Sequence, residues 1–183
     1  MVFLGFCKNL SQILLRKSLP QAVVTISFDG EFSSCQRGMD LISVDMTKFD
    51  ILMLDNENFT LDGRLVFKKD FNNPVGLNIK LERKNRAMWI PVTTRLIPNF
   101  CDVILHPNDF WTTVVAAFEK QRCPFPAGHV ETFDNTNIGN MARQMMLPPS
   151  MLGDWRMFVE LRTMRDGKLE TECTQAVFLL EEV

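Results

Sequence analysis

The residues of this chain whose types could do chemistry are five cysteines and two histidines. The cysteines lie far apart in the sequence, at Cys7, Cys35, Cys101, Cys123 and Cys173. They form no C-x-x-C pair and have no histidine at metal-ligand spacing, so a zinc site is not expected. An odd, widely spaced set fits two disulfides and one remaining thiol, and Cys7 is the natural remainder because it lies in a different kind of segment. Buried free thiols are the alternative.

The two histidines, His106 and His129, limit the nucleophile–base pairs that the chain could form. No nucleophile of a suitable pattern is near either one, and the chain contains no Gly-rich phosphate loop and no G-x-S-x-G elbow. Each histidine is therefore expected to be a surface or hydrogen-bonded residue rather than a general base. Four evenly spaced aspartates do not match a calcium loop and are expected on a solvated strand face; they are Asp40, Asp45, Asp50 and Asp55. We expect no catalytic residue, no metal site and no cofactor, and hence a protein that is not an enzyme.

The composition favours binding of an apolar molecule. The 183 residues are enough for one domain with a substantial core, and the net charge of −2 argues against nucleic acid as a partner. The chain has 15 Phe, 11 Met and 3 Trp but no Tyr. Phe and Met without Tyr suit a deformable interior that could take up a hydrophobic ligand, although an ordinary Phe-rich core would have the same composition.

The clearest helical pattern lies between the third and fourth cysteines, over residues 108–120. Its apolar residues recur at the spacing of one helix face, and Asn108 or Asp109 can cap its start. A disulfide from Cys101 to Cys123 would tie both ends of this helix to one place. An apolar helix face is usually ordinary core, which is the alternative to a ligand-facing role. The face consists of Phe110, Trp111, Val114, Val115 and Phe118.

The rest of the chain favours β-strands in a single domain. Residues 75–83 alternate apolar and polar side chains, and so do residues 154–165. The pair Asp166-Gly167 predicts a hairpin turn, and Pro91 predicts an edge strand or a bulge within residues 87–97. About eight or nine antiparallel strands with one helix predict a mainly-β sandwich or cup. The other strand-like segments are 22–28, 39–54, 59–69, 129–133 and 168–181.

Residues 1–21 are interpreted as a leader or weak signal segment before a domain of residues 22–183. Residues 1–7 are apolar, but Lys8 interrupts them and two basic residues follow at 16–17, so the signal-peptide pattern is poor. A mis-assigned start and a cytosolic leader are the alternatives. Two N-x-S/T sequons, at Asn9 and Asn58, fit a secreted protein, although such sequons also arise by chance. Asn58 is the expected glycosylation site.

The second half of the chain carries an ordered set of motifs. In order, these are Phe100-Cys101-Asp102-Val103, Cys123-Pro124-Phe125-Pro126-Ala127-Gly128, Leu147-Pro148, Gly153-Asp154-Trp155, Leu161, Gly167 and Cys173. With them the chain resembles the ganglioside-activator branch of the ML-type lipid-recognition family, and it is closer still to insect chemosensory proteins of the CheB type. The first half resembles the family more weakly, through the segments Phe32-Ser33-Ser34-Cys35 and Trp89-Ile90-Pro91. Together the two halves extend the resemblance over residues 22–183.

The resemblance implies a β-cup of about eight strands that encloses a hydrophobic lipid pocket. It also implies the disulfides Cys35–Cys173 and Cys101–Cys123, the second of which agrees with the helical pattern. In a loop-entropy treatment these disulfides would stabilise the fold by on the order of 5 and 3 kcal/mol, respectively. The activator proteins carry extra local disulfides that are missing here, so the loops at the mouth of the cup are expected to differ.

The function that the resemblance implies is a secreted binding protein for a lipid or other hydrophobic ligand, of a chemosensory kind that carries a pheromone or a cuticular hydrocarbon. The alternative is an activator that lifts glycolipids from membranes for a lysosomal hydrolase. Besides the ligand, the implied partners are a membrane surface and a receptor or hydrolase. The candidate ligand-binding residues, each of which could also be plain core, are Phe67, Leu77, Ile79, Trp89, Phe110, Trp111, Val114, Val115, Phe118, Trp155 and Met157.

Overall fold

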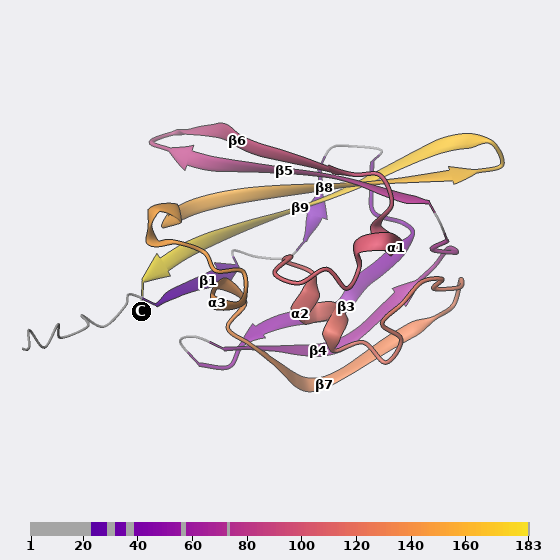
Figure 1. Cartoon of the computed structure of the whole chain (residues 1–183), viewed down its shortest axis with the longest axis horizontal. Helices are drawn as coiled ribbons and strands as arrows, with labels where there is room; N and C mark the ends of the chain where they lie inside the picture. The colour runs from indigo at the N-terminus through magenta and orange to yellow at the C-terminus, as the bar shows by residue number, and fades with distance from the viewer. Residues whose placement is uncertain (1–22, 29–31, 36–38, 56–57, 73, 183) are drawn as a thin grey trace, which may run out of the picture.

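The computed structural model describes residues 23–28, 32–35, 39–55, 58–72 and 74–182. Within them the chain forms two antiparallel sheets and a few short helices, which confirms the mainly-β fold predicted from the sequence (Figure 1). The interpreted leader, together with Cys7 and the sequon at Asn9, lies outside the described residues.

The larger sheet has the strand order β1-β9-β8-β5-β6, and the short β2 pairs with β9. Its four long strands form two hairpins, β5-β6 and β8-β9. Apolar and polar side chains alternate along β5 and β8, and Leu77, Ile79 and Leu161 are buried on the face turned toward the smaller sheet. The strands are β1 (Val24–Phe28), β2 (Ser33–Ser34), β5 (Val75–Asn85), β6 (Met88–Ile97), β8 (Gly153–Arg165) and β9 (Lys168–Glu182).

Both turn and edge predictions are confirmed in this sheet. Asp166 and Gly167 join β8 to β9 with φ angles of 48° and 72°, which a tight two-residue hairpin turn requires. β6 is an edge strand, and its pairing with β5 shifts by one residue next to Pro91. Proline fits this position because it has no N–H to donate to a neighbouring strand.

The smaller sheet has the strand order β3-β4-β7. β7 continues to Gly139, beyond the predicted segment 129–133. Most of the extra residues are polar because β7 is an edge strand, where side chains reach water, although Ile138 is buried in the core. They still pair with β4 through Thr136 and Asn137. The strands are β3 (Val44–Met53), β4 (Phe59–Phe67) and β7 (Val130–Gly139).

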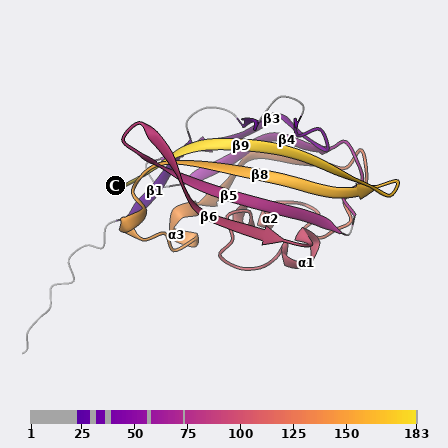
Figure 2. The same cartoon turned by 90° about the horizontal axis from the view of Figure 1, so that it is seen from above.

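Three short α-helices and one 3-10 turn occur among the described residues, where the sequence predicted one helix. α1 packs on β5 and α2 packs on β7, so this segment bridges the two sheets on the side of β6 (Figures 1 and 2). No helix in the described part of the chain is long and apolar enough to cross a membrane. The elements are α1 (Phe100–Val103), α2 (Thr112–Ala116), α3 (Met141–Gln144) and the 3-10 turn Pro149–Met151.

The predicted helix over residues 108–120 is wrong in its length and in its cap. α2 spans only Thr112–Ala116, and four of these five residues are β-branched, which lose side-chain freedom in a helix. Asn108 has a φ of 65°, outside the right-handed helical region. Asp109 does not cap the helix with its side chain but forms an ion pair with Arg95 of β6.

The two disulfides that the resemblance implies are both present. Cys101–Cys123 joins α1 to the chain that follows α2, so it closes the helical segment rather than the two ends of a single helix. Cys35–Cys173 joins the residue after β2 to β9 across a sequence separation of 138 residues. The second disulfide therefore fixes the chain that leaves the first strands onto the middle of the larger sheet.

The core between the sheets is built largely from phenylalanine. Phe67 stacks on Phe125 with ring centroids 4.6 Å apart, and Phe118 contacts both Phe125 and Phe133 edge to face or tilted. All four side chains are buried. The abundant phenylalanines thus fill the space between β4, β7 and the helical segment, which closes this side of the fold.

Candidate ligand-binding site

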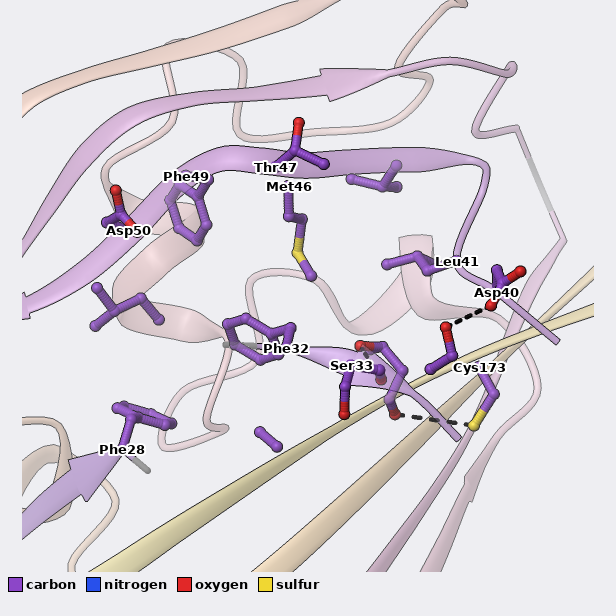
Figure 3. Close-up of a pocket in the computed structure, with 15 residues that line it drawn as sticks. Phe28, Phe32, Ser33, Asp40, Leu41, Met46, Thr47, Phe49, Asp50 and Cys173 are labelled. Carbon is purple, nitrogen blue, oxygen red and sulfur yellow. Dashed lines mark hydrogen bonds between the residues drawn. The ribbon is translucent and has the colours of Figure 1, made fainter. Parts of the chain in front are cut away.

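The opposite side of the fold, away from α1 and α2, contains a cavity of about 340 Å³. It lies between β3 of the smaller sheet and β1, β2 and β9 of the larger sheet (Figure 3). Its apolar wall is formed by Phe28, Phe32, Leu41, Met46, Phe49 and Ile51. Its polar wall includes Ser33, Ser34, Asp40 and Thr174.

A bulge in β3 orients the apolar wall. Asp45 pairs with Val66 and Lys48 pairs with Arg64, so β3 has one residue more than β4 between these two pairs. On a regular strand Met46 and Phe49, three positions apart, would point to opposite faces. The extra residue in β3 returns both side chains to one face, and both point into the cavity (Figure 3).

The wall of the cavity that β9 contributes leaves space open because its side chains are small. Thr174 and Ala176 face β3 at the place where a larger residue would reach across to the other sheet. Ala176 pairs with Met157 of β8, and Met157 pairs with Leu81 of β5, so these three side chains form one row on the inner face of the larger sheet. Met157 and Leu81 pack against the core but are only half-buried. In a completely filled sandwich an inner row would be dry, so the sheets are not packed together along this row.

The chain enters β3 through a segment that is fastened to β9. The Glu172 carboxylate, only 4% exposed, accepts hydrogen bonds from the backbone N–H of Ser43 at 2.7 Å and from the Ser43 hydroxyl at 2.7 Å. Lys69, just after β4, donates to the same carboxylate at 3.1 Å. The backbone N–H of Cys173 donates to the carbonyl oxygen of Met39 at 2.7 Å. These contacts hold residues 39–43 as one wall of the cavity and join the two sheets.

The environment of Glu172 sets its charge. Burial by itself would raise the pKa of this carboxyl group, but the hydrogen bonds from Ser43 and the ammonium group of Lys69 outweigh burial and hold the pKa below its usual value. The same contacts act on the ammonium group of Lys69. Burial by itself would lower the pKa of Lys69, but the carboxylates of Glu170 and Glu172 outweigh burial and raise the pKa above its usual value. The link between the sheets is therefore a buried ion pair near neutral pH.

The eleven predicted ligand-binding residues lie elsewhere, and none of them lines the cavity. Met157 is nearest in register, because it pairs with Ala176 of the cavity wall. Phe110 and Val114 are half-buried beside the core. Trp89 lies on the outer face of the larger sheet, where Arg156 is 4.8 Å from its ring centre. The remaining seven are buried in the core: Phe67, Leu77, Ile79, Trp111, Val115, Phe118 and Trp155. Contact of these residues with a ligand stays a prediction.

Both histidines are hydrogen-bonded or exposed and lie outside the cavity lining. The ring of His129 is 2.6 Å from Glu131, a carboxylate that is 1% exposed and also accepts the backbone N–H of Glu119 at 2.6 Å. His106 is largely exposed, with Nδ1 3.2 Å from Asp109. Glu131 thus fastens the chain after α2 to β7. No group of three or more His, Cys, Asp or Glu side chains in the described part of the chain could hold a metal ion.

Two of the four evenly spaced aspartates, Asp40 and Asp45, have hydrogen-bonded partners nearby in the structure. Asp45 is paired with Lys68 at 2.9 Å and accepts hydrogen bonds from Thr47, and these bonds hold its pKa well below the usual range. Asp40 accepts a hydrogen bond from the hydroxyl of Ser34 within the cavity.

Asn58, the expected glycosylation site, lies directly before β4. Its side-chain amide donates to Asp55 at 2.9 and 3.1 Å. The amide nitrogen would have to leave this contact to carry a glycan in the folded protein. Glycosylation at this position stays a prediction.

Sequence reasoning missed the residues that build the cavity. The apolar residues Met46 and Phe49 are three positions apart, which does not fit the alternation of a regular strand, and this spacing is the signal of the bulge in β3. Nothing local in the sequence marks Glu172 as a structural anchor, because its main partner, Ser43, is 129 residues away.

Comparison with models of known protein families and with curated proteins finds no match for this chain. The geometry of the cavity is therefore the main support for the function proposed below. The described lining offers apolar surface, hydroxyl groups and carboxylates, which suits binding of an amphipathic molecule.

We predict that Glu172→Gln lowers the free energy of unfolding by about 1–3 kcal/mol near pH 7, the cost expected when a buried charged hydrogen-bond network loses its charge. The loss follows from a pKa that is lowered in the folded state. Such a group stabilises the fold above its unfolded pKa of about 4.3, and this contribution disappears as the pH falls through the folded pKa. The wild type and the variant should therefore converge in acid, as measured by urea unfolding from pH 7 to pH 3.

Glu170→Gln is the matched control for this experiment. Glu170 also contacts Lys69, at 3.0 Å, but its side chain is 36% exposed. Its substitution should cost less than about 1 kcal/mol, as is usual for exposed ion pairs. Equal losses for the two variants, or a Glu172→Gln loss that does not depend on pH, would contradict the anchoring role of Glu172.

Proposed function

We propose that this protein binds a hydrophobic or amphipathic small molecule in the cavity between β3 and β9 and carries it without chemical change. The observation that carries the proposal is the cavity itself, which is bordered by eight apolar side chains and lies on the side of the fold opposite the phenylalanine packing. A volume of about 340 Å³ is at the lower end of the range of small-molecule sites. The half-buried inner row of Leu81 and Met157 offers adjoining apolar surface.

An extracellular carrier is the form of this function that the covalent structure supports best. Two disulfides are compatible with an oxidising compartment, where such bonds persist. The motifs that resemble the chemosensory CheB-type proteins support a pheromone or a cuticular hydrocarbon as the ligand, and the same resemblance suggests a receptor as the partner. Wherever the ligand is delivered, the cavity would serve to keep an apolar molecule in solution.

The proposal predicts that Ala176→Phe blocks ligand uptake. Ala176 faces the cavity, and a phenyl ring at this position would occupy the space that the ligand needs. We expect the affinity for a neutral fluorescent probe such as N-phenyl-1-naphthylamine to fall by at least about tenfold, equivalent to about 1.4 kcal/mol. Circular dichroism should still report a folded β protein, because the ring enters existing space instead of displacing packed atoms.

Val177→Phe is the matched control, since Val177 is the next residue on β9 and its side chain points to the outer face. It should leave probe binding unchanged. Unchanged binding by Ala176→Phe, or an equal loss in both variants, would refute the cavity as the binding site.

A second candidate function, lifting of lipids from membranes, is favoured by one exposed hairpin. At the free end of β5-β6, Met88 is 68% exposed and Val92 is 53% exposed. The basic residues Arg83, Lys84 and Arg86 belong to the same hairpin. Exposed apolar side chains among cations fit the surface of an anionic bilayer, where each cation near the surface contributes about 1 kcal/mol. A protein that docks in this way could collect a lipid for a hydrolase.

This candidate predicts that Met88→Ser combined with Val92→Ser reduces sedimentation with phosphatidylserine-containing vesicles by about tenfold, since apolar burial supports the electrostatic attraction. The control is Met164→Ser with Leu169→Ser, which removes similar exposed apolar area (57% and 62%) from the β8-β9 hairpin at another end of the sheet (Figure 1). Failure of the wild type to bind such vesicles at low salt, or equal effects of the two double variants, would count against membrane docking.

A further inference from the structure

The cavity is divided between an apolar end and a polar end. Phe28 and Phe49 lie toward one end, where Asp50 is next to Phe49 on β3, whereas Ser33, Asp40 and Cys173 lie toward the other, near Leu41 (Figure 3). Phe32 and Met46 lie between them. A ligand that fills such a cavity should itself have an apolar part and a polar head group.

The polar end has more hydrogen-bond acceptor capacity left than donor capacity. The Ser34 hydroxyl donates to Oδ1 of Asp40, so its proton is already used. The Thr174 hydroxyl donates to the carbonyl oxygen of Ser33 at 3.2 Å. The Ser33 hydroxyl accepts from the side-chain amide of Gln175 at 3.2 Å and keeps one proton to donate. Oδ2 of Asp40 has no hydrogen-bond partner among the described residues. A carboxylate oxygen can only accept, so this end favours a ligand group that donates.

The charge of the cavity lining also favours a ligand group that donates hydrogen bonds. Asp40 and Asp50 are the charged side chains among the described residues of the lining, and none of these residues is lysine, arginine or histidine. A ligand carboxylate would meet negative charge without a compensating cation among the described residues of the lining. An ammonium group would gain an ion pair with Asp40, and a hydroxyl group would gain a hydrogen bond to a charged acceptor.

We infer that the ligand of this cavity is an amphiphile with a hydroxyl or amino head group rather than a fatty acid, and that Asp40 receives that head group. This inference rests on the proposed function, because it assigns the ligand class of the same cavity. Asp40 fixes the orientation: the head group lies beside Ser34 and the Cys35–Cys173 disulfide, and the apolar chain runs toward Phe28 and Phe49.

The test is displacement of N-phenyl-1-naphthylamine at pH 7 by four compounds that share one chain: decan-1-ol, decylamine, decanoic acid and decane. The alcohol and the amine should displace the probe about five- to tenfold better than the acid, the range expected for one hydrogen bond to a partly solvated charged group. Asp40→Asn should remove most of this preference, mainly by weakening the amine and improving the acid.

Asp166→Asn is the matched control, because it removes one aspartate from the β8-β9 turn, where Asn-Gly is as suitable as Asp-Gly. It should leave the order of the four compounds unchanged, and circular dichroism should show both variants to be folded. Equal displacement by all four compounds, or a preference that survives Asp40→Asn, would overturn the head-group inference and leave the proposed function intact. If none of the four displaces the probe, or the probe does not bind, the proposed function itself fails.

Discussion

The fold depends on a buried carboxylate that joins its two sheets. Glu172 belongs to the larger sheet, and it holds the start of β3 through Ser43 and the end of β4 through Lys69. The adjacent residue, Cys173, carries the disulfide to Cys35. On the other side of the molecule a second buried carboxylate, Glu131, fastens the chain after α2. Burying a charge is tolerable only when its lone pairs are satisfied, and each of these carboxylates accepts hydrogen bonds from two backbone N–H groups as well as contacting side chains.

These anchors explain how a sandwich can remain hollow. The helical segment and the phenylalanine stack close the side of the fold near β6 and β7, so that side needs no further support. On the opposite side the Glu172 network joins the two sheets, and the Cys35–Cys173 disulfide fixes the segment after β2 onto β9 within the larger sheet. The small side chains of Thr174 and Ala176 do not fill the space between the sheets there. The bulge in β3 then turns Met46 and Phe49 into the remaining space.

The sequence predicted the features that depend on neighbouring residues. The alternation of apolar and polar residues predicted strands of the long hairpins, Asp166-Gly167 predicted a turn, and Pro91 predicted an edge strand. Each of these features depends on residues that are close together in the sequence. The helix was overestimated because its apolar spacing was considered without its run of β-branched residues. The position and lining of the cavity could not be predicted, since it lies where β1, β3 and β9 meet from distant parts of the chain. In the sequence Glu172 cannot be distinguished from a surface glutamate, because its partner Ser43 is 129 positions away.

Mass spectrometry of the protein purified from a eukaryotic secretory host, first native and then denatured, tests the central claim most directly. The native spectrum reports any molecule held in the cavity, and the denatured spectrum reports the disulfides. The account predicts a bound apolar or amphipathic molecule in the wild type that is absent from Ala176→Phe, with a mass about four hydrogens below that of the reduced chain, as two disulfides require. An empty wild-type protein with five free thiols would contradict both the carrier function and the anchored cavity on which it depends.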